Sequence, residues 1–200
     1  METRMNHKSD KPTVRKTMLA ARKHHHQHHR DRAAAALVAQ FDAAHLTPET
    51  HPVVACYAAT GSELDTAPLM QHLARRGFCL ALPFCQTAEQ PAQFRAYQPG
   101  DTLASDGLGV AAPVSAQSCQ PDIIFLPLVA VDAGGRRLGR GGGTYDRTLA
   151  DLRAKQHRFL AIGLAYDMQV MDVCPTDPHD QKLDAVISEQ RYIACAARRG

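Results

Sequence analysis

Runs of apolar residues alternate along the chain with polar segments that have helical spacing. The apolar runs are short, nearly free of charge and bounded by turn residues, as is typical of buried strands. The intervening segments place apolar residues three and four positions apart, which is the spacing of a helix with one buried face. The predicted strands are Val53–Ala58, Phe78–Leu82, Ile123–Val131, Phe159–Ala165 and Asp184–Ser188, and the predicted helices are Thr13–Ala44, Glu63–Arg76 and Thr144–Lys155.

This alternation predicts a three-layer α/β/α sandwich with a mostly parallel, Rossmann-like central sheet. The strand, helix and strand between Val53 and Leu82 indicate neighbouring parallel strands joined by a right-handed crossover. The segment from Phe84 to Ser118 is interrupted by prolines and glycines, with short strands around Phe94–Tyr97. Its pattern does not determine how it folds.

Length and composition favour one domain. A chain of 200 residues with 44% hydrophobic content is sufficient for one α/β core, so we expect a single domain over residues 1–200, with residues 1–10 disordered. The six cysteines form no CxxC pair. There is no secretory signal and no apolar run near the roughly 18 residues of a membrane span. We therefore expect a reduced, soluble, cytoplasmic protein without a membrane partner.

The N-terminal arm is basic and rich in histidine. Its first 32 residues carry nine Lys/Arg against three Asp/Glu, and six of the eleven histidines. Such an arm suits either an anionic partner or a solvated helix face. Pairs within His24–His29 have the i, i+4 spacing that can bind a divalent metal, but we interpret this cluster as a solvated helix surface.

The stretch from Arg137 to Arg147 has the most specific chemistry. Within eleven residues it contains four glycines, three arginines, a tyrosine and Asp146. Glycines let the backbone approach a ligand, and the N–H groups of a following helix carry partial positive charge. Guanidinium groups suit phosphates, and a carboxylate suits a phosphate-bound Mg²⁺. The stretch therefore predicts a nucleotide phosphate site.

Other glycine-rich motifs match this stretch less well. No Gly-Lys-Ser/Thr follows the glycines, which excludes a P-loop. A dinucleotide fingerprint would need a third glycine where this chain has Thr144. A purely structural turn remains an alternative, against which the three arginines and Asp146 argue.

These residues closely resemble the signature of the 5-formyltetrahydrofolate cyclo-ligase family, also called 5,10-methenyltetrahydrofolate synthetases. The resemblance extends across almost all 200 residues, because three further segments occur in the family's order. The segments that carry it are Lys11 with Arg15, Glu63–Thr66, Leu126–Asp132 leading into Arg137–Arg147, and His179–Ser188.

The resemblance implies an enzyme that uses ATP and Mg²⁺ to cyclise 5-formyltetrahydrofolate to 5,10-methenyltetrahydrofolate. ADP and phosphate would be released, by way of a phosphorylated formyl intermediate. The implied substrates are two small molecules, a reduced folate and ATP. We expect a monomer and no nucleic-acid partner.

The resemblance also assigns roles to residues. Arg140 and Asp146 would act in catalysis, and Asp146 and Asp180 would bind Mg²⁺. Ala58, Glu63 and Gly143 would contact the folate. The residues implied for ATP are Lys11, Arg15, Arg137, Leu138, Gly139, Arg140, Gly141, Gly142, Gly143, Thr144 and Tyr145.

The chain departs from the family pattern at two positions. Thr144 replaces the first of two tyrosines usual in the family, and Gly142 stands where some members have lysine. Two alternatives stay open: a non-catalytic nucleotide- or RNA-binding member of the fold, and a ligase acting on a different formamide-like substrate. Retention of Asp146 and Asp180 argues against the first, whereas Thr144 is compatible with the second.

Overall fold

A seven-stranded sheet forms the centre of the computed structural model, which describes residues 11–46 and 52–195. The five inner strands are parallel, and the two edge strands, β11 and β3, are antiparallel to their neighbours. Residues 1–10, which the sequence predicts to be disordered, lie outside the described residues. In spatial order the strands are β11 (Tyr192–Ala194), β10 (Ala185–Ser188), β9 (Leu160–Ala165), β6 (Ile123–Pro127), β1 (Val53–Ala55), β2 (Cys79–Phe84) and β3 (Gln93–Tyr97).

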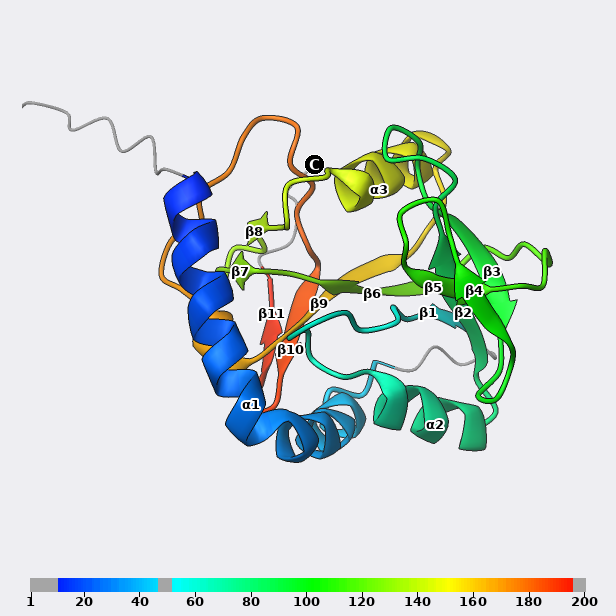
Figure 1. The fold of residues 1–200 in the computed structure, drawn as a ribbon, viewed down its shortest axis with the longest axis horizontal. Coiled ribbons are helices and arrows are strands. Elements are labelled where there is room, and N and C mark those ends of the chain that lie inside the picture. The colour runs from blue at the N-terminus through cyan, green and yellow to red at the C-terminus, as the bar shows by residue number, and fades with distance from the viewer. Residues whose placement is uncertain (1–10, 47–51, 196–200) are drawn as a thin grey trace, which may run out of the picture.

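Helices cover both faces of this sheet (Figure 1). Helices α1 (Lys11–Ala43) and α2 (Ala67–Arg75) lie on one face, and α3 (Thr144–Ala154) lies on the other. Leu37 and Leu69 enter one apolar cluster with strand residues, while Leu149 enters a second cluster on the opposite face. The predicted α/β/α sandwich with a mostly parallel central sheet is therefore confirmed.

The predicted strand Ile123–Val131 is wrong in its second half. Strand β6 ends at Pro127, which has no N–H to continue a ladder. The chain then leaves the sheet, and β7 (Ala130–Val131) pairs with β8 (Arg137–Leu138) in a separate antiparallel hairpin. This hairpin carries the glycine-rich stretch away from the sheet edge.

The strand predicted around Phe94–Tyr97 is confirmed as β3, and the remaining differences lie at element boundaries, in the rest of the middle segment and at β11, which follows the last predicted strand. Helix α2 begins at Ala67, not Glu63, with a proline in its first turn, where a missing N–H costs little. The middle segment forms β3 and a hairpin of β4 (Leu103–Ser105) and β5 (Ala111–Pro113), which contacts β2 and β3. A short 3₁₀ helix, η1 (Asp167–Gln169), follows β9.

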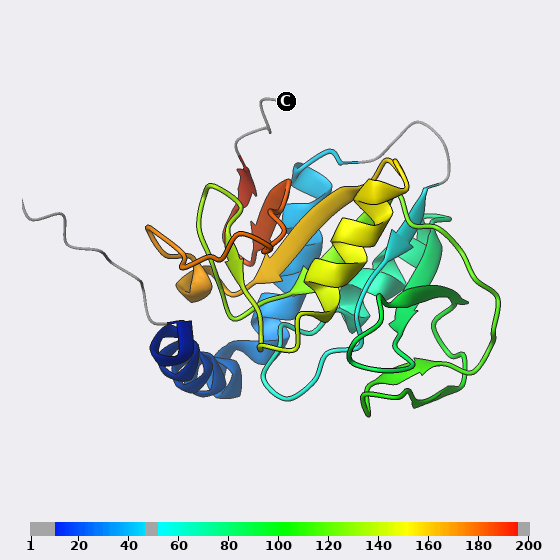
Figure 2. The ribbon, with the colours of Figure 1, turned by 90° about the horizontal axis from the view of Figure 1, so that it is seen from above.

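Helix α1 connects two parts of the molecule. Its first turns contact the β7–β8 hairpin, where Val14 and Met18 pack around Leu138. Its last turns contribute Leu37 and Phe41 to the main core. Figures 1 and 2 show the helix running along one end of the sheet and then beneath it. The predicted helix Thr13–Ala44 is confirmed, with a start two residues earlier.

The histidines of α1 are not all solvated. The rings of His25 and Tyr166 lie edge to face at 5.0 Å, and Nδ1 of His26 is 2.8 Å from the Tyr166 hydroxyl. Tyr166 is fully buried at the end of β9. His24, His28 and His29 are exposed. The interpretation as a solvated surface is thus wrong for His25 and His26, because the helix turns them towards the sheet.

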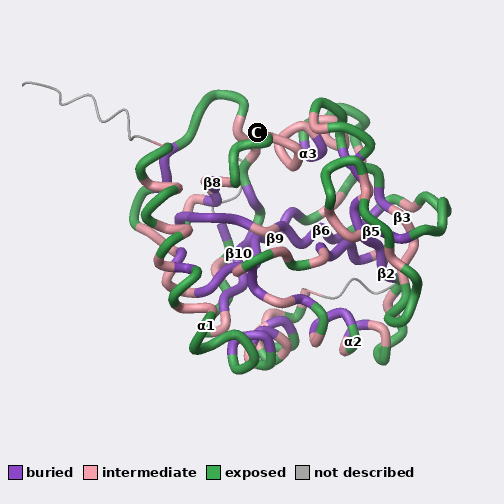
Figure 3. The backbone as a smooth tube through the Cα atoms, in the orientation of Figure 1, coloured by how far each residue is buried: buried purple, intermediate pink, exposed green. Residues whose placement is uncertain are grey.

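Burial is concentrated in the central strands (Figure 3). The loops and the outer faces of the helices are mostly exposed, as expected for a domain with one layered core. Within the described residues, none of the helices combines the length and the apolar character needed to span a bilayer.

Phe41 provides a test of the α1 face of the core. Its ring lies edge to face with Phe125 at 5.9 Å and with Phe78 at 6.4 Å. Phe41→Ala should lower the free energy of unfolding by about 3–5 kcal/mol, because the lost contacts leave a cavity that the sheet cannot fill. Urea denaturation measures this change. Val173→Ala, at a side chain that is 63% exposed, is the control and should change stability by less than about 0.5 kcal/mol. An equal effect of both substitutions would contradict the packing described.

Candidate functional site

A cavity of about 440 Å³ lies at the carboxyl edge of the sheet. Its walls include Tyr57 and Ala58, just after β1, and Pro127 and Leu128, at the end of β6. Strand β2 lies on one side of β1 and β6 on the other, so the chain connections diverge between β1 and β6. In open α/β sheets this divergence leaves a crevice in which ligands bind.

Every residue that the sequence assigned to the site lines this cavity. The structure brings together segments that are up to 169 residues apart in the chain. The fifteen residues are Lys11, Arg15, Ala58, Glu63, Arg137, Leu138, Gly139, Arg140, Gly141, Gly142, Gly143, Thr144, Tyr145, Asp146 and Asp180.

The glycine-rich loop leads directly into helix α3. Gly143 is the N-cap and has a φ of 67°, and Gly141 has a φ of 109°. The positive φ of Gly143 favours glycine at this position, because a residue with a Cβ is strained there. Within the described residues no side chain caps the helix, so the N–H groups of its first turn are available to an anion.

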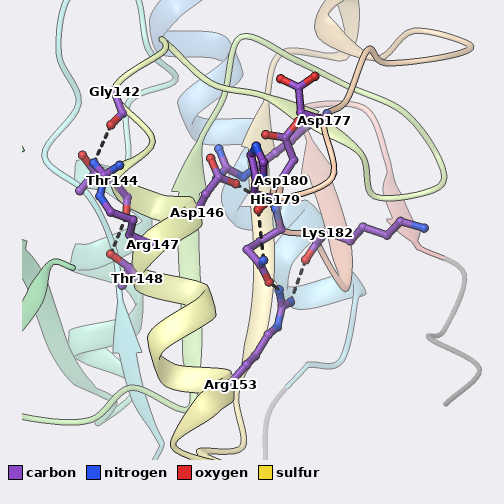
Figure 4. A network of polar contacts seen from close by, with 12 residues as sticks. Gly142, Thr144, Asp146, Arg147, Thr148, Arg153, Asp177, His179, Asp180 and Lys182 are labelled. Atoms are coloured by element: carbon purple, nitrogen blue, oxygen red, sulfur yellow. Dashed lines mark hydrogen bonds and ion pairs between the residues drawn. The ribbon is translucent and has the colours of Figure 1, made fainter. Parts of the chain in front are cut away.

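Arg147 does not face the cavity. Its Nη2 donates to the carbonyl oxygen of Gly142 at 2.6 Å (Figure 4). The same Nη2 donates to the carbonyl oxygen of Ala88. This guanidinium therefore ties the glycine loop to the segment between β2 and β3. Arg147 is not among the residues that the resemblance implies for ATP, and it does not line the cavity.

The buried Arg137 and the partly exposed Asp146 form an ion pair. Nη2 of Arg137 is 2.8 Å from Oδ1 of Asp146, and only 3% of the arginine side chain is exposed. The same Oδ1 accepts the backbone N–H of Gln181 at 3.0 Å. Burial makes the pair resistant to screening by salt, so the Asp146 carboxylate is held in one orientation.

Helix α3 also fixes the loop that carries Asp180. Asp146 binds this loop from the first turn of the helix, through the N–H of Gln181. Arg153 binds it from the last turn, donating to the side chain of Gln181 at 2.6 Å and to the carbonyl of Lys182 at 2.8 Å (Figure 4). Asp146 and the 177–182 loop are thereby brought to the same side of the cavity.

Lys11, at the start of α1, contacts the acidic loop on this side of the cavity. Its Nζ lies 2.8 Å from Oδ2 of Asp177 and 2.5 Å from Oδ2 of Asp180. Burial lowers the pKa of Lys11, but the hydrogen bonds to Asp177 and Asp180 outweigh it, so the pKa is raised and the side chain stays charged. Four residues on, Nε of Arg15 donates to the carbonyl of Gly139 at 2.9 Å. The first turns of α1 thus meet both the glycine loop and the acidic loop.

Glu63 lies on the opposite wall in a turn before α2. Its carboxylate accepts hydrogen bonds from the N–H of Thr60 at 2.9 Å and from the Thr60 hydroxyl at 3.1 Å. Nη1 of Arg140 is 3.7 Å from Glu63 Oε1 and 2.9 Å from the Thr60 hydroxyl. The Arg140 side chain is 61% exposed, so it can turn towards a ligand without breaking core packing.

Several lining residues were not found from the sequence. Asp177 lies in a polar loop with no distinguishing pattern. Thr60 has a detectable signal, because it stands three residues before Glu63 in the spacing of a capping box. Most of the others come from the middle segment or the strand before it: the acidic Asp106, and a set that gives the cavity an apolar wall, Pro83, Cys85, Ala92, Leu108 and Val110.

Comparison with known proteins agrees with the geometry. Residues 7–189 match the 5-formyltetrahydrofolate cyclo-ligase family. The chain is 33% identical over 148 residues to 5-formyltetrahydrofolate cyclo-ligase of Mycolicibacterium smegmatis, covering 70% of this chain and 75% of that protein. It is 33% identical over 144 residues to the Escherichia coli K12 protein of the same name, covering 69% and 78%.

Solved structures show the same architecture. The NMR structure of Aquifex aeolicus 5,10-methenyltetrahydrofolate synthetase superposes with a TM-score of 0.78 at 26% identity, covering 95% of each chain. The Mycoplasma pneumoniae synthetase superposes with a TM-score of 0.69 at 23% identity, covering 90% of this chain and 99% of that one, which supports the fold. From its sequence match and its fold, the chain belongs to the 5-formyltetrahydrofolate cyclo-ligase family of enzymes.

Proposed function

We propose that this protein converts 5-formyltetrahydrofolate into 5,10-methenyltetrahydrofolate, consuming ATP with Mg²⁺ and releasing ADP and phosphate. The observation that carries the proposal is the composition of the cavity. One side has a glycine loop at a helix N-terminus together with Lys11 and Arg15, as a polyphosphate requires. The other has apolar side chains and the buried Glu63 carboxylate, as a polar heteroaromatic ring requires.

The chemistry follows from the poor leaving ability of a formyl oxygen. That oxygen attacks the γ-phosphorus of ATP, the bond to ADP breaks, and a phosphorylated iminium results. N10 of the same folate then attacks the formyl carbon and loses its proton. The C–O bond breaks with its electron pair, phosphate departs, and the methenyl bridge remains. No nucleophilic side chain is needed, so the protein mainly positions the two substrates and neutralises charge.

Three groups suit the nucleotide. The N–H groups of the first turn of α3, preceded by Gly143, favour a phosphate oxygen. Arg140 is exposed and flanked by Thr60 and Glu63, so its guanidinium can reach charge that develops between ATP and folate. Lys11 uses two donors on Asp177 and Asp180, and its third N–H is suited to a phosphate.

Asp146 and Asp180 fit a magnesium ion that completes its coordination with phosphates and water. In the described part of the chain, no group of three or more His, Cys, Asp or Glu side chains is arranged to hold a metal alone. That agrees with Mg²⁺, which commonly takes one or two carboxylates and several other oxygens. The ion would neutralise phosphate charge. Arg137 and Lys11 meanwhile orient the two carboxylates.

The proposal that the cavity binds a folate is based on the residues of the wall that contains Glu63. Glu63 offers carboxylate oxygens to ring N–H groups, while Ala58 and Gly143 leave room for a flat ring. Thr144, at the start of α3, is smaller than tyrosine and provides less stacking surface. We further propose that the protein acts as a monomer. We place the reaction in the cytoplasm.

A direct assay tests the reaction. Absorbance in the methenyl-folate band should rise when the protein is mixed with ATP, Mg²⁺ and 5-formyltetrahydrofolate. It should stay flat when ATP is replaced by an analogue with a non-transferable γ-phosphate, because the formyl oxygen then cannot be phosphorylated. Absence of a rise at high enzyme concentration would refute the assignment and favour a different formamide-like substrate or a binding role.

Asp146→Asn tests the acidic side of the cavity. The amide keeps an acceptor for Arg137 and for the Gln181 N–H but lacks the charge that a metal ligand needs. Turnover should fall by about 100-fold or more. Circular dichroism should show a retained fold. The matched control is Asp151→Asn on the same helix, where the carboxylate pairs with Lys155 at the surface, and its turnover should be unchanged. Wild-type turnover in Asp146→Asn would remove the metal role.

A further inference from the structure

A second buried guanidinium lies behind the cavity wall. Arg22 lies in the middle of α1, is only 3% exposed and does not line the cavity. Its Nη1 donates to the carbonyl of Leu128 at 3.0 Å, and its Nε donates to the hydroxyl of Ser62 at 3.1 Å. Leu128 and the residue after Ser62 both face the cavity. Arg22 therefore links the Leu128 segment of the cavity wall to the Glu63 segment, from the side that faces away from the cavity.

Arg22 also acts on Glu63 through charge. Burial lowers the pKa of Arg22, and the nearby Glu63 carboxylate opposes that effect. The only cation within ion-pair distance of Glu63 among the described residues is Arg140, which is mostly exposed and screened by water. The guanidinium of Arg22 is always protonated and shielded from solvent. Its electrostatic attraction for the Glu63 carboxylate is therefore screened less by water than that of Arg140.

We propose that Arg22 is a positioning residue for the folate, acting through Ser62 and the Glu63 carboxylate without touching the substrate. The proposal rests on the function proposed above. Glu63 sits in a turn that no regular element holds, between β1 and α2. Its orientation depends on Thr60 within the turn and on α1 from outside. Loss of the Arg22 contact should therefore loosen the folate end of the cavity and leave the phosphate end, formed by α3 and the first turns of α1, in place.

If Arg22 only stabilised the fold, its replacement would have different effects on substrate binding. Two other contacts in the structure allow a positioning role to be distinguished from a stabilising role. The carbonyl of Leu128 also accepts Nε2 of Gln169 at 2.8 Å, so it keeps a partner when Arg22 is replaced. Arg30 lies eight residues further along α1 and contacts the same segment between β1 and α2. Its Nη2 forms an exposed ion pair with Asp65 at 2.9 Å. Arg30 thus offers a matched contact between the same helix and the same segment, away from Glu63.

The test compares Arg22→Met with Arg30→Met. Arg22→Met keeps the apolar stem and removes the guanidinium. It should raise the KM for 5-formyltetrahydrofolate about tenfold, the factor expected when a misplaced Glu63 loses one charge-assisted hydrogen bond to the folate, and change the KM for ATP by less than about twofold. Arg22→Lys should restore part of the folate affinity because it restores the charge. Arg30→Met should leave both KM values near those of the wild type.

Ser62→Ala provides a milder route to the same contact, should Arg22→Met fold poorly. It should raise the folate KM in the same direction, and in the double variant the two effects should be less than additive. Calorimetric binding of 5-formyltetrahydrofolate without ATP gives a second readout that does not depend on turnover. Thermal unfolding monitors the fold of each variant.

The outcomes separate the two proposals. A wild-type protein that neither binds nor cyclises 5-formyltetrahydrofolate refutes the proposed function and, with it, the role of Arg22. An active wild type whose Arg22→Met and Ser62→Ala variants bind folate normally refutes the role of Arg22 alone. Equal rises in both KM values, or equal effects in Arg22→Met and Arg30→Met, would show a structural tie and would also overturn the proposal.

Discussion

The site depends on the pairing of buried positive charge. A guanidinium removed from water costs several kcal/mol unless hydrogen bonds and opposite charge offset that cost. Arg137 offsets much of this cost through Asp146, although its Nε has no hydrogen-bond partner among the described residues, and the buried Arg22 offsets it through Ser62, the Leu128 carbonyl and the nearby Glu63. The acidic groups proposed to bind metal and folate are thereby oriented by arginines.

The sheet supplies the opening in which these charges meet. Because the chain runs from β1 to β2 on one side and later places β6 on the other, the carboxyl ends of β1 and β6 diverge. The hairpin β7–β8 then carries the glycine loop over this opening and into α3. Positive φ at Gly141 and Gly143 lets the loop turn tightly enough to present helix N–H groups to the cavity.

Helix α1 completes the site from the side. Lys11, Arg15 and Arg22 lie on one stretch of helix about 16 Å long, at 1.5 Å per residue, and reach the acidic loop, the glycine loop and the Glu63 turn in that order. One rigid element therefore sets the spacing between both ends of the cavity. Three basic residues of the N-terminal arm therefore face the site, whereas Lys16, Lys23 and Arg32 are exposed.

The sequence by itself determined the layered fold, and its resemblance to a known family predicted a site whose fifteen assigned residues line one cavity. Period and composition revealed the strands and helices, and the motif order brought Lys11, Glu63, Arg137–Asp146 and Asp180 into one hypothesis. Only the tertiary structure decided that Arg147 faces backbone carbonyls, that His25 and His26 pack on Tyr166, and that Arg22 stands behind Glu63. The physical reason is that a local pattern records which side chains are apolar or charged, whereas the direction in which a charge points is set by partners distant in the chain.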